Sequence, residues 1–352
     1  MSTVKQWVKP QVYSQKAYTV NLPKVNIKLN QNESAWDWPD AIKQSICDKI
    51  KSAAWNRYPE LQPQNIKEKL AQKYNLCNEQ LLIGNGSNEI LQAIITAVIK
   101  PGDKVLTLSP TFAMYKILAE QRGCKLIECP LDNDFNLNPS EFLDLAKDAE
   151  LVILCNPNSP TGKIVDNAYI ESLLNTANCP VIIDEAYADY SSETALPLVN
   201  RYNNLIITRT FSKAFALAGF RAGFAIMQAS LAENIQKCLL PFNVDTSTVI
   251  VLECLLEYEA LVKEQVNLVV IERDALIAKL NTISGVRAIT SHANFFMVQA
   301  SIGADLTFNH LLGKGILARD ISSYAGCADM LRITVGSIYE NQKLLQAFRS
   351  LQ

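Results

Sequence analysis

The chain has 352 residues, of which 49% are apolar and 19% charged, and its formal net charge is −2. This length exceeds one average domain, and the composition is typical of a globular protein with a large core rather than of a disordered chain. Lysines and arginines form no basic stripe, which argues against a nucleic-acid partner. The most apolar stretches, residues 90–99 and 249–256, fall short of the ~20 residues of a membrane span, so no membrane partner is expected.

The cysteines and histidines indicate neither a disulfide framework nor a metal site. Nine cysteines are scattered without a Cys-x-x-Cys pair, and the two histidines, His292 and His310, lie near no such pair. An odd number of unclustered cysteines is typical of reduced thiols in a cytoplasmic protein. The first residues also lack the apolar run of a signal peptide, which favours the same location. We therefore expect a cytoplasmic protein without a metal ion.

The first segment, residues 1–40, shows no clear element of a large domain. It includes Pro10, Pro23 and Pro39. Proline interrupts helices and strands because it lacks a backbone N–H and fixes φ. We expect this segment to be an arm that packs on a smaller domain or on a partner subunit.

Residues 41–245 alternate between short apolar runs and helix-like segments. The runs are rich in valine, isoleucine and leucine with little polar alternation, as expected of strands covered on both faces; they span residues 104–108, 125–128, 151–155, 181–184, 205–208 and 222–227. Helical patterns fall between several of them, at residues 88–99, 113–121 and 167–175. This order predicts an α/β fold in which a large domain holds a mostly parallel sheet flanked by helices.

From about residue 246 the pattern changes. A long helical stretch, with one break, is expected over residues 248–281, followed by short strands at residues 286–289, 294–299, 316–319 and 331–335. A closing helix is expected over residues 340–351. Residues 246–352 are therefore predicted to form a second, smaller α+β domain that begins with a linking helix.

A glycine turn lies between a predicted strand and a predicted helix at residues 82–89. Gly84 and Gly86 permit a tight turn, Ser87 can cap the helix, and free N–H groups at a helix start attract phosphate. An ordinary glycine turn is the alternative. A dinucleotide fingerprint is disfavoured because its third glycine is replaced by Glu89, and Gly162-Lys163 lacks the flanking residues of a Walker phosphate loop.

An aspartate ends the apolar run at residues 181–184. In open α/β sheets, ligands gather at the carboxyl ends of strands. Asp184 could there hold a pyridine nitrogen protonated, which makes the ring an electron acceptor, and Tyr187 could donate to a phenolate oxygen. The alternative is an acid that caps the next element.

The most informative residue is Lys213. It lies between hydroxyl residues and apolar ones, with Thr210 and Ser212 before it and Arg221 after it. A pyridoxal-phosphate site needs an amine for the aldehyde, hydroxyls and a guanidinium for the phosphate, and a carboxylate for the ring nitrogen. The apolar residues 214–218 make a solvated surface lysine an unsuitable interpretation. The cofactor predicted is pyridoxal 5′-phosphate.

At these residues the chain resembles the fold-type I pyridoxal-phosphate aminotransferases, and among them the histidinol-phosphate aminotransferases of the class II group. Residues 212–221 match the pattern Ser-Lys-Ala-Phe-x-Leu-Ala-Gly-x-Arg. Further matching segments are residues 29–33, 56–60, 84–88, 156–162 and 331–336. The similarity therefore covers residues 29–337. The lysine pattern is highly specific for the cofactor and only moderately specific for the substrate.

The resemblance implies a role for each matching residue. Lys213, Asp184 and Tyr187 would be catalytic, and Ser87, Asn88, Phe112, Asn158, Thr210, Ser212 and Arg221 would contact the cofactor, with Phe112 stacked on its ring. Tyr58 would reach the phosphate of the neighbouring subunit's cofactor, which implies a homodimer. Arg332 would bind the substrate carboxylate, Arg319 would help to hold a substrate phosphate, and Asn32 would line the substrate entrance.

The chain departs from the family pattern at two places. The family usually has asparagine directly before Pro-Thr-Gly, where it contacts the phenolate oxygen; here Ser159 occupies that position and Asn158 precedes it. Either of these residues could make the contact. Tyr13 and Tyr18 are both candidates for the tyrosine of the arm that reaches the substrate phosphate.

The resemblance implies reversible amino transfer between histidinol phosphate and 2-oxoglutarate, a step of histidine biosynthesis that yields imidazole-acetol phosphate and glutamate. Two alternatives share the fold: transamination of aromatic amino acids, and decarboxylation of an amino-acid phosphate. A third, a non-catalytic regulator on this fold, is disfavoured because Lys213 and Asp184 are both present and no DNA-binding extension precedes Leu29.

Overall fold

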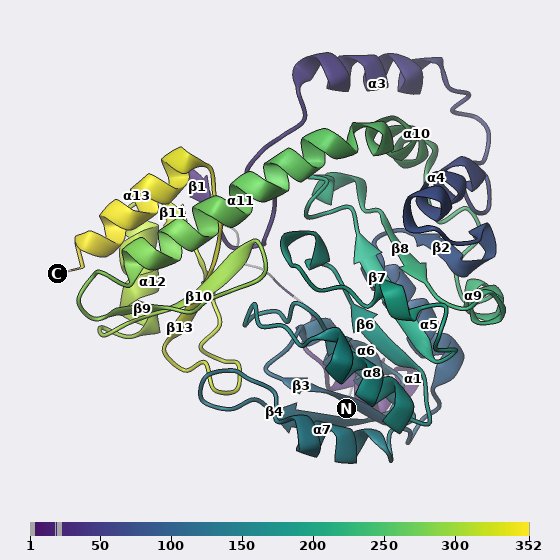
Figure 1. Ribbon diagram of the computed structural model, residues 1–352, viewed down its shortest axis with the longest axis horizontal. Helices are drawn as coiled ribbons and strands as arrows, with labels where there is room; N and C mark the ends of the chain where they lie inside the picture. Colours follow the sequence, from purple (N-terminus) through teal and green to yellow (C-terminus); the bar gives the residue numbers. More distant parts are fainter. Residues whose placement is uncertain (1–3, 18, 20–22, 352) are drawn as a thin grey trace.

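The computed structural model describes residues 4–17, 19 and 23–351. The chain forms a large part with a central sheet and a smaller part with a short sheet, and helix α11 (Glu259–Leu280) runs from one to the other (Figure 1). This arrangement confirms the predicted α/β fold with a large, mostly parallel sheet and a small α+β unit.

The central sheet has seven strands in the order β2-β8-β7-β6-β5-β3-β4. Their bounds are Leu81–Gly84 (β2), Lys104–Ser109 (β3), Lys125–Pro130 (β4), Leu151–Cys155 (β5), Val181–Asp184 (β6), Leu205–Thr210 (β7) and Gly223–Ile226 (β8). Within this sheet β8 runs antiparallel to both of its neighbours, and the other described pairings are parallel. Every residue of β5 is buried, as its unbroken apolar sequence predicts.

Helices cover both faces of this sheet. One face packs on α4 (Gln64–Tyr74), α7 (Pro139–Ala146), α8 (Asn167–Thr176) and α10 (Thr246–Leu255), with α3 (Asp40–Ser52) beyond α10. The other face packs on α5 (Ser87–Val98), α6 (Ala113–Gln121) and α9 (Ala229–Gln236). Short 3₁₀ turns complete this part at Asn78–Gln80, Ala188–Tyr190, Leu196–Leu198 and Ala218–Phe220. Because the sheet is covered on both sides, the carboxyl ends of its parallel strands are left as the place where polar side chains can gather.

The smaller part has its own core. Strands β9 (Val286–Ala288), β10 (Phe295–Ala300), β12 (Arg319–Asp320) and β13 (Met330–Thr334) form an antiparallel sheet in the order β12-β13-β10-β9. Helices α12 (Ala304–Gly313), α13 (Ile338–Arg349) and α11 pack on it. The helical stretch predicted for residues 248–281 breaks at the 3₁₀ turn Leu256–Tyr258. The single strand predicted for residues 316–319 is divided between two sheets: β11 (Ile316–Leu317) pairs with β1 (Ile27–Lys28), whereas β12 belongs to the four-stranded sheet.

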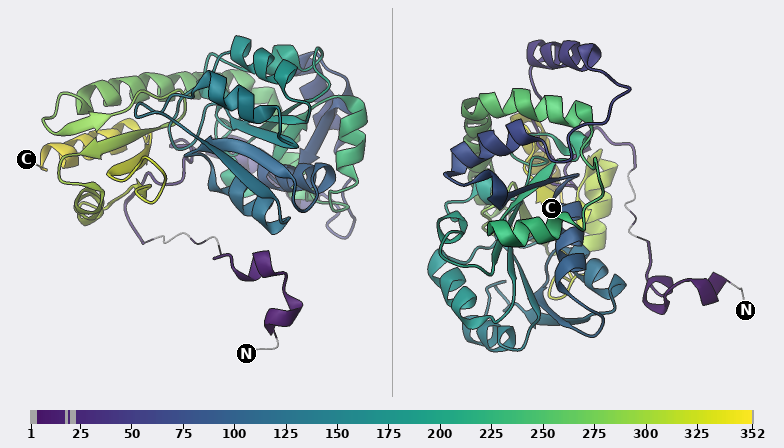
Figure 2. Two further views of the ribbon diagram at one scale, coloured as in Figure 1. Left: turned by 90° about the horizontal axis from the view of Figure 1, so that it is seen from below. Right: turned by 90° about the vertical axis from the view of Figure 1, so that its right-hand side faces the viewer.

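The two short helices near the N-terminus project from one side of the molecule (Figure 2). They are α1 (Val4–Trp7) and α2 (Pro10–Tyr13). The amide of Gln15 donates to the Ile117 carbonyl and to the Glu120 carboxylate, both at 3.2 Å, which attaches this region to α6 of the large part. Further along, β1 pairs in parallel with β11 of the smaller part. The N-terminal segment therefore contacts both parts of the chain.

Candidate active site

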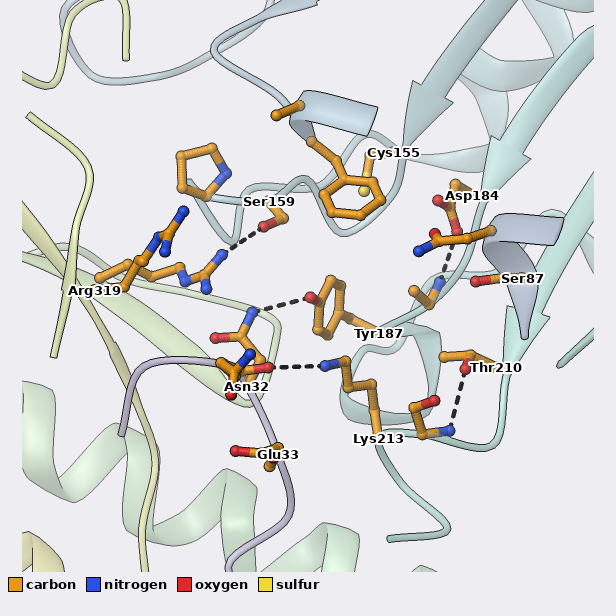
Figure 3. A pocket seen from close by; sticks show the side chains of 18 of the residues that line it. Asn32, Glu33, Ser87, Cys155, Ser159, Asp184, Tyr187, Thr210, Lys213 and Arg319 are labelled. Carbon is orange, nitrogen blue, oxygen red and sulfur yellow. Dashed lines mark hydrogen bonds between the residues drawn. The ribbon is translucent and has the colours of Figure 1, made fainter. Parts of the chain in front are cut away.

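A cavity of about 340 Å³ lies where the carboxyl ends of the central strands face the smaller part and residues 30–33. Its walls come from segments that are far apart in the sequence (Figure 3). They include Asn30, Gln31, Asn32, Glu33, Ser87, Asn88, Thr111, Phe112, Cys155, Ser159, Asp184, Tyr187, Thr210, Ser212, Lys213, Arg221, Arg319, Tyr324 and Arg332. Most residues predicted to form the site are thus brought to one cavity.

Lys213 enters the cavity from the turn that follows β7. Phe211 and Phe215, on either side of it, are buried and their rings meet at 5.2 Å, so apolar packing anchors the turn. The Lys213 Nζ donates to the Gln31 carbonyl at 3.0 Å. Burial lowers the pKa of Lys213 to about 7, and the positive charge of Arg332 acts in the same direction. An amine with this pKa can be a nucleophile and a proton acceptor near neutral pH.

Asp184 ends β6 and lies deep in the cavity, with 3% of its surface exposed. Its Oδ2 accepts a hydrogen bond from the Tyr115 hydroxyl at 2.6 Å, and its Oδ1 accepts from the Ala186 N–H at 3.2 Å. Burial raises the pKa of Asp184, and the hydrogen bond from Tyr115 opposes this rise. The groups that act most strongly on its charge include no lysine or arginine. A cationic ring nitrogen would supply the missing positive charge.

Tyr187 lines the same cavity as Asp184 and is held by the segment before α3. Its Oη accepts a hydrogen bond from the Asn32 amide at 2.9 Å, and its ring meets Phe295 edge-on at 4.9 Å. Asn32 is buried and has a positive φ of 54°, and its backbone N–H donates to Thr334 at 2.9 Å. Since the Tyr187 oxygen accepts from Asn32, its own proton is available to another acceptor in the cavity.

The start of α5 and the turns after β7 form a cradle for an anion. Ser87 and Asn88 begin α5, directly after Gly86. Arg221 has a positive φ of 50°, and its Nη1 donates to the Ser212 hydroxyl at 3.2 Å. A Cβ on Gly86 would lie 2.8 Å from the Arg221 guanidinium, and one on Gly223 would lie 2.5 Å from the Ser87 N. Only glycine therefore allows the helix start and the guanidinium to approach each other this closely, as a phosphate site requires.

Two arginines of the smaller part lie side by side at the opposite wall. Arg319 on β12 and Arg332 on β13 are register partners, and both line the cavity. Arg332 donates to the Ser159 hydroxyl at 3.1 Å and to the Asn30 carbonyl at 3.0 Å. This wall can bind a ligand that carries a carboxylate or a phosphate.

The structure distinguishes between Ser159 and Asn158. Ser159 lines the cavity, whereas Asn158 does not. The Asn158 amide donates to the Pro110 carbonyl and to Thr161, both at 3.0 Å, and it accepts from Thr111 at 2.7 Å. Asn158 therefore stabilises the loop rather than facing the cavity, because its hydrogen-bonding atoms are taken by neighbouring residues.

Two predicted residues lie away from this cavity, and one cannot be placed. Tyr58 is 81% exposed and stacks on Phe242 with ring centroids 4.5 Å apart. Tyr13, at the end of α2, is exposed. Tyr18, the other tyrosine considered for the arm, lies outside the described residues.

Sequence reasoning missed four residues that shape the site. Tyr115 holds Asp184, the Gln31 carbonyl accepts from Lys213, and Cys155 and Tyr324 line the cavity. A signal for Tyr115 existed, because it lies three residues after Phe112 in a predicted helix, which places both residues on one helix face. The other three depend on tertiary contacts that no local pattern shows.

The described residues contain no cluster of histidine, cysteine and acidic side chains that could hold a metal ion. Among them, no helix is long and apolar enough to cross a membrane.

The residues present fit pyridoxal 5′-phosphate. The amine of Lys213, the carboxylate of Asp184 and the glycine-lined anion cradle match its aldehyde, ring nitrogen and phosphate. Two observations support this match. No lysine or arginine is among the groups that act most strongly on the buried Asp184 carboxylate. A Cβ at Gly86 or Gly223 would fill the space between the start of α5 and its neighbours.

Comparisons with known proteins agree with this site. Residues 24–348 match the model of the family "Aminotransferase class I and II". A histidinol-phosphate aminotransferase of Caldanaerobacter subterraneus subsp. tengcongensis is 35% identical over 339 residues, which cover 96% of each chain. The structure of the histidinol-phosphate aminotransferase from Clostridium acetobutylicum has a TM-score of 0.86 at 24% identity and covers 92% of this chain and 98% of that one. The enzyme of the same name from Sinorhizobium meliloti, in complex with pyridoxal 5′-phosphate, has a TM-score of 0.86 at 21% identity over 98% of both chains.

The fold and the site define an aminotransferase that depends on pyridoxal 5′-phosphate. The chain belongs to the class I and II aminotransferase family, and within it to the histidinol-phosphate aminotransferases. The predicted enzyme class, fold type and cofactor are thereby confirmed. The alternative of a non-catalytic regulator is set aside, because the chain belongs to a family of enzymes.

Proposed function

We propose that the protein exchanges an amino group between histidinol phosphate and 2-oxoglutarate, forming imidazole-acetol phosphate and glutamate. The observation that carries this proposal is the pairing of Arg319 with Arg332 across β12 and β13 at one wall of the cavity. Both substrates carry anionic tails, and adjacent guanidinium groups suit a phosphate in one half-reaction and carboxylates in the other.

Each residue has a task that its position supports. When bound, the cofactor withdraws electrons from the bond between the substrate α-carbon and its hydrogen and carries the amino group between the two substrates. Lys213, once its amine is free, is placed to take the proton from the substrate carbon that carries the amino group and to return it when the amino group is transferred. Asp184 holds the positive charge of the ring nitrogen, and the Tyr187 hydroxyl donates into the cavity.

Binding and orientation are assigned to the surrounding residues. The start of α5, with Ser87 and Asn88, would hold the cofactor phosphate together with Thr210, Ser212 and Arg221, and Phe112, which lines the cavity, would supply an apolar face for the cofactor ring. Ser159 takes the contact to the phenolate oxygen that was also considered for Asn158. Asn32 fixes Tyr187 beside the substrate entrance.

A panel of amino donors tests the substrate assignment. Histidinol phosphate, histidinol and the aromatic amino acids are each assayed with 2-oxoglutarate. For Arg319→Ala we expect kcat/KM for histidinol phosphate to fall by about ten- to hundredfold, since a charge-assisted contact is lost. Activity on phosphate-free donors should stay nearly unchanged. Equal loss on all donors would contradict the role of Arg319.

The same panel separates the two alternatives that share the fold. An aromatic aminotransferase would prefer donors without a phosphate tail. An amino-acid-phosphate decarboxylase would release carbon dioxide without consuming 2-oxoglutarate. Borohydride trapping of the cofactor on Lys213, absent from Lys213→Ala, tests the cofactor site independently of the substrate.

We also propose a homodimer in which Tyr58 reaches the phosphate site of the partner subunit. Exposed apolar side chains support this: Tyr58, 81% exposed, stacks on the exposed Phe242, and Trp55 and Leu240, close to them in the sequence, are 77% and 74% exposed in the single chain. Adjoining exposed apolar side chains are typical of interaction surfaces. Light scattering gives the oligomeric state, and Tyr58→Phe is expected to weaken cofactor binding without changing that state. A monomer with full activity would refute the assignment.

A cytoplasmic location is proposed as well. All nine cysteines are free thiols in the structure, and five of them are buried. Free thiols are retained in reducing compartments. Fractionation of cells with an antibody to the protein tests this location.

A further inference from the structure

A buried tyrosine next to the cofactor site, Tyr115, has no role in the mechanism above. Tyr115 is fully buried, and its hydroxyl donates to the Oδ2 of Asp184 at 2.6 Å. The Ala186 N–H donates to the other carboxylate oxygen at 3.2 Å. Donors from two different elements, α6 and the turn after β6, thus fix both oxygens of the carboxylate.

The first turn of α6 connects this tyrosine to the wall of the cavity. Phe112, which precedes α6 and lines the cavity, accepts a backbone hydrogen bond from Tyr115 at 3.2 Å. The two rings meet edge-on, with centroids 5.5 Å apart. A single turn of helix therefore carries the ring that faces the cavity and the hydroxyl that holds Asp184 from behind.

The surroundings of Asp184 leave few groups that favour its ionised form. The titratable groups that face it are Tyr115 from α6, Cys155 from the neighbouring position on β5, and Glu185 and Tyr187 from its own strand end. Glu185 opposes ionisation, although its own carboxylate is bound by Arg209. Burial raises the pKa of Asp184, and the Tyr115 hydroxyl is the foremost group that lowers it.

We propose that Tyr115 is a positioning residue, which keeps the Asp184 carboxylate ionised and aimed into the cavity. The proposal rests on the proposed function, because an ionised Asp184 matters only where a protonated ring nitrogen is to be held. Tyr115 acts through Asp184 and touches neither cofactor nor substrate.

The test combines two substitutions in one cycle. Tyr115→Phe removes the hydroxyl and keeps the ring, and Asp184→Asn removes the charge that the hydroxyl serves. The dissociation constant of pyridoxal 5′-phosphate is measured for the wild type, both single variants and the double variant by fluorescence titration. The pH dependence of the carboxyl infrared band that Asp184→Asn abolishes is recorded for the wild type and for Tyr115→Phe. Tyr169→Phe is the control, because its hydroxyl bonds the Pro139 carbonyl away from the site.

We expect Tyr115→Phe to weaken cofactor binding by about tenfold, the effect of losing one hydrogen bond to a charged group. The carboxyl band should titrate at higher pH than in the wild type. In the Asp184→Asn background the further loss should be less than about twofold, because the two changes remove the same interaction. Tyr169→Phe should bind the cofactor as the wild type does.

Two results would overturn the proposal. One is an unchanged titration of the carboxyl band in Tyr115→Phe, which would make the hydroxyl a packing element only. The other is an equal loss of cofactor affinity with and without Asp184, which would mean that Tyr115 acts by another route. Both measurements use the cofactor alone, so they remain valid if histidinol phosphate proves not to be the substrate, and the donor panel fails or succeeds separately.

Discussion

The partly buried lysine at the cavity gives the stability of the apoenzyme a definite pH dependence. Burial and the charge of Arg332 lower the pKa of Lys213 from 10.5 to about 7 in the folded chain. Between these two pH values the unfolded chain carries a proton on Lys213 that the folded chain lacks. Because the unfolded state binds more protons there, stability rises with pH across this window and is lowest below its lower end.

The magnitude follows from the size of the shift. Each pKa unit corresponds to about 1.4 kcal/mol, so this lysine reduces stability by roughly 4 kcal/mol at pH 7 and by roughly half of that at pH 9. The gain on raising the pH is thus roughly 2 kcal/mol. For a chain of this length the gain corresponds to about 3 °C in melting temperature.

Thermal melting of the apoenzyme at pH 7 and pH 9 tests this reasoning, with Lys213→Met as the variant that lacks the amine. The difference in melting temperature between wild type and Lys213→Met isolates the contribution of the lysine, since other titrating groups are shared. Losing the hydrogen bond to Gln31 shifts the variant equally at both pH values. Lys237→Met, at an exposed position after α9, is the control. A wild type that gains nothing relative to Lys213→Met would show that Lys213 is not buried as a neutral amine.

Three further predictions concern the framework of the site. Glu185→Gln leaves the buried Arg209 without its counter-charge, so the free energy of unfolding in urea should fall by about 3–5 kcal/mol. Adding Arg209→Met to this variant should restore part of the loss. An unchanged midpoint of urea unfolding in Glu185→Gln would refute this prediction. Asn32→Ala should be less stable than Asn32→Gly by about 1 kcal/mol, because glycine accepts the positive φ at this position without strain and alanine does not. Equal stability of the two variants would contradict the positive φ of residue 32. Gly223→Ala should abolish cofactor binding while Gly219→Ala, in open space, should not, as fluorescence titration would show.

The central strands and the lysine site could be predicted because their signals are local. The apolar runs of β5 and β6 match the structure residue for residue. Lys213 was recognisable because two residues of the anion cradle lie close to it in the sequence, as the Arg221–Ser212 hydrogen bond shows. Residues that follow one strand end need no long-range information to be placed together.

Other features could not be predicted because they depend on contacts across the fold. Asn158 and Ser159 are adjacent in sequence and equally polar, and only the packing of the loop shows which of them faces the cavity. The strand predicted over residues 316–319 was divided because β1, about 290 residues earlier, pairs with its first half. The Gln31 carbonyl meets Lys213 through the backbone, which has no sequence signature.

The charges of the site are arranged so that an anionic substrate changes the lysine it needs. Arg332 lowers the pKa of Lys213, so the cavity without an anion favours the neutral amine. When a carboxylate or phosphate binds at Arg332 and Arg319, it offsets their positive charge, and the affinity of Lys213 for a proton increases. In the empty cavity the amine is therefore less readily protonated, and with an anion bound at the two arginines it is a stronger base for the proton on the substrate carbon. This electrostatic coupling between the smaller part and the turn after β7 requires that the two parts face each other across one cavity.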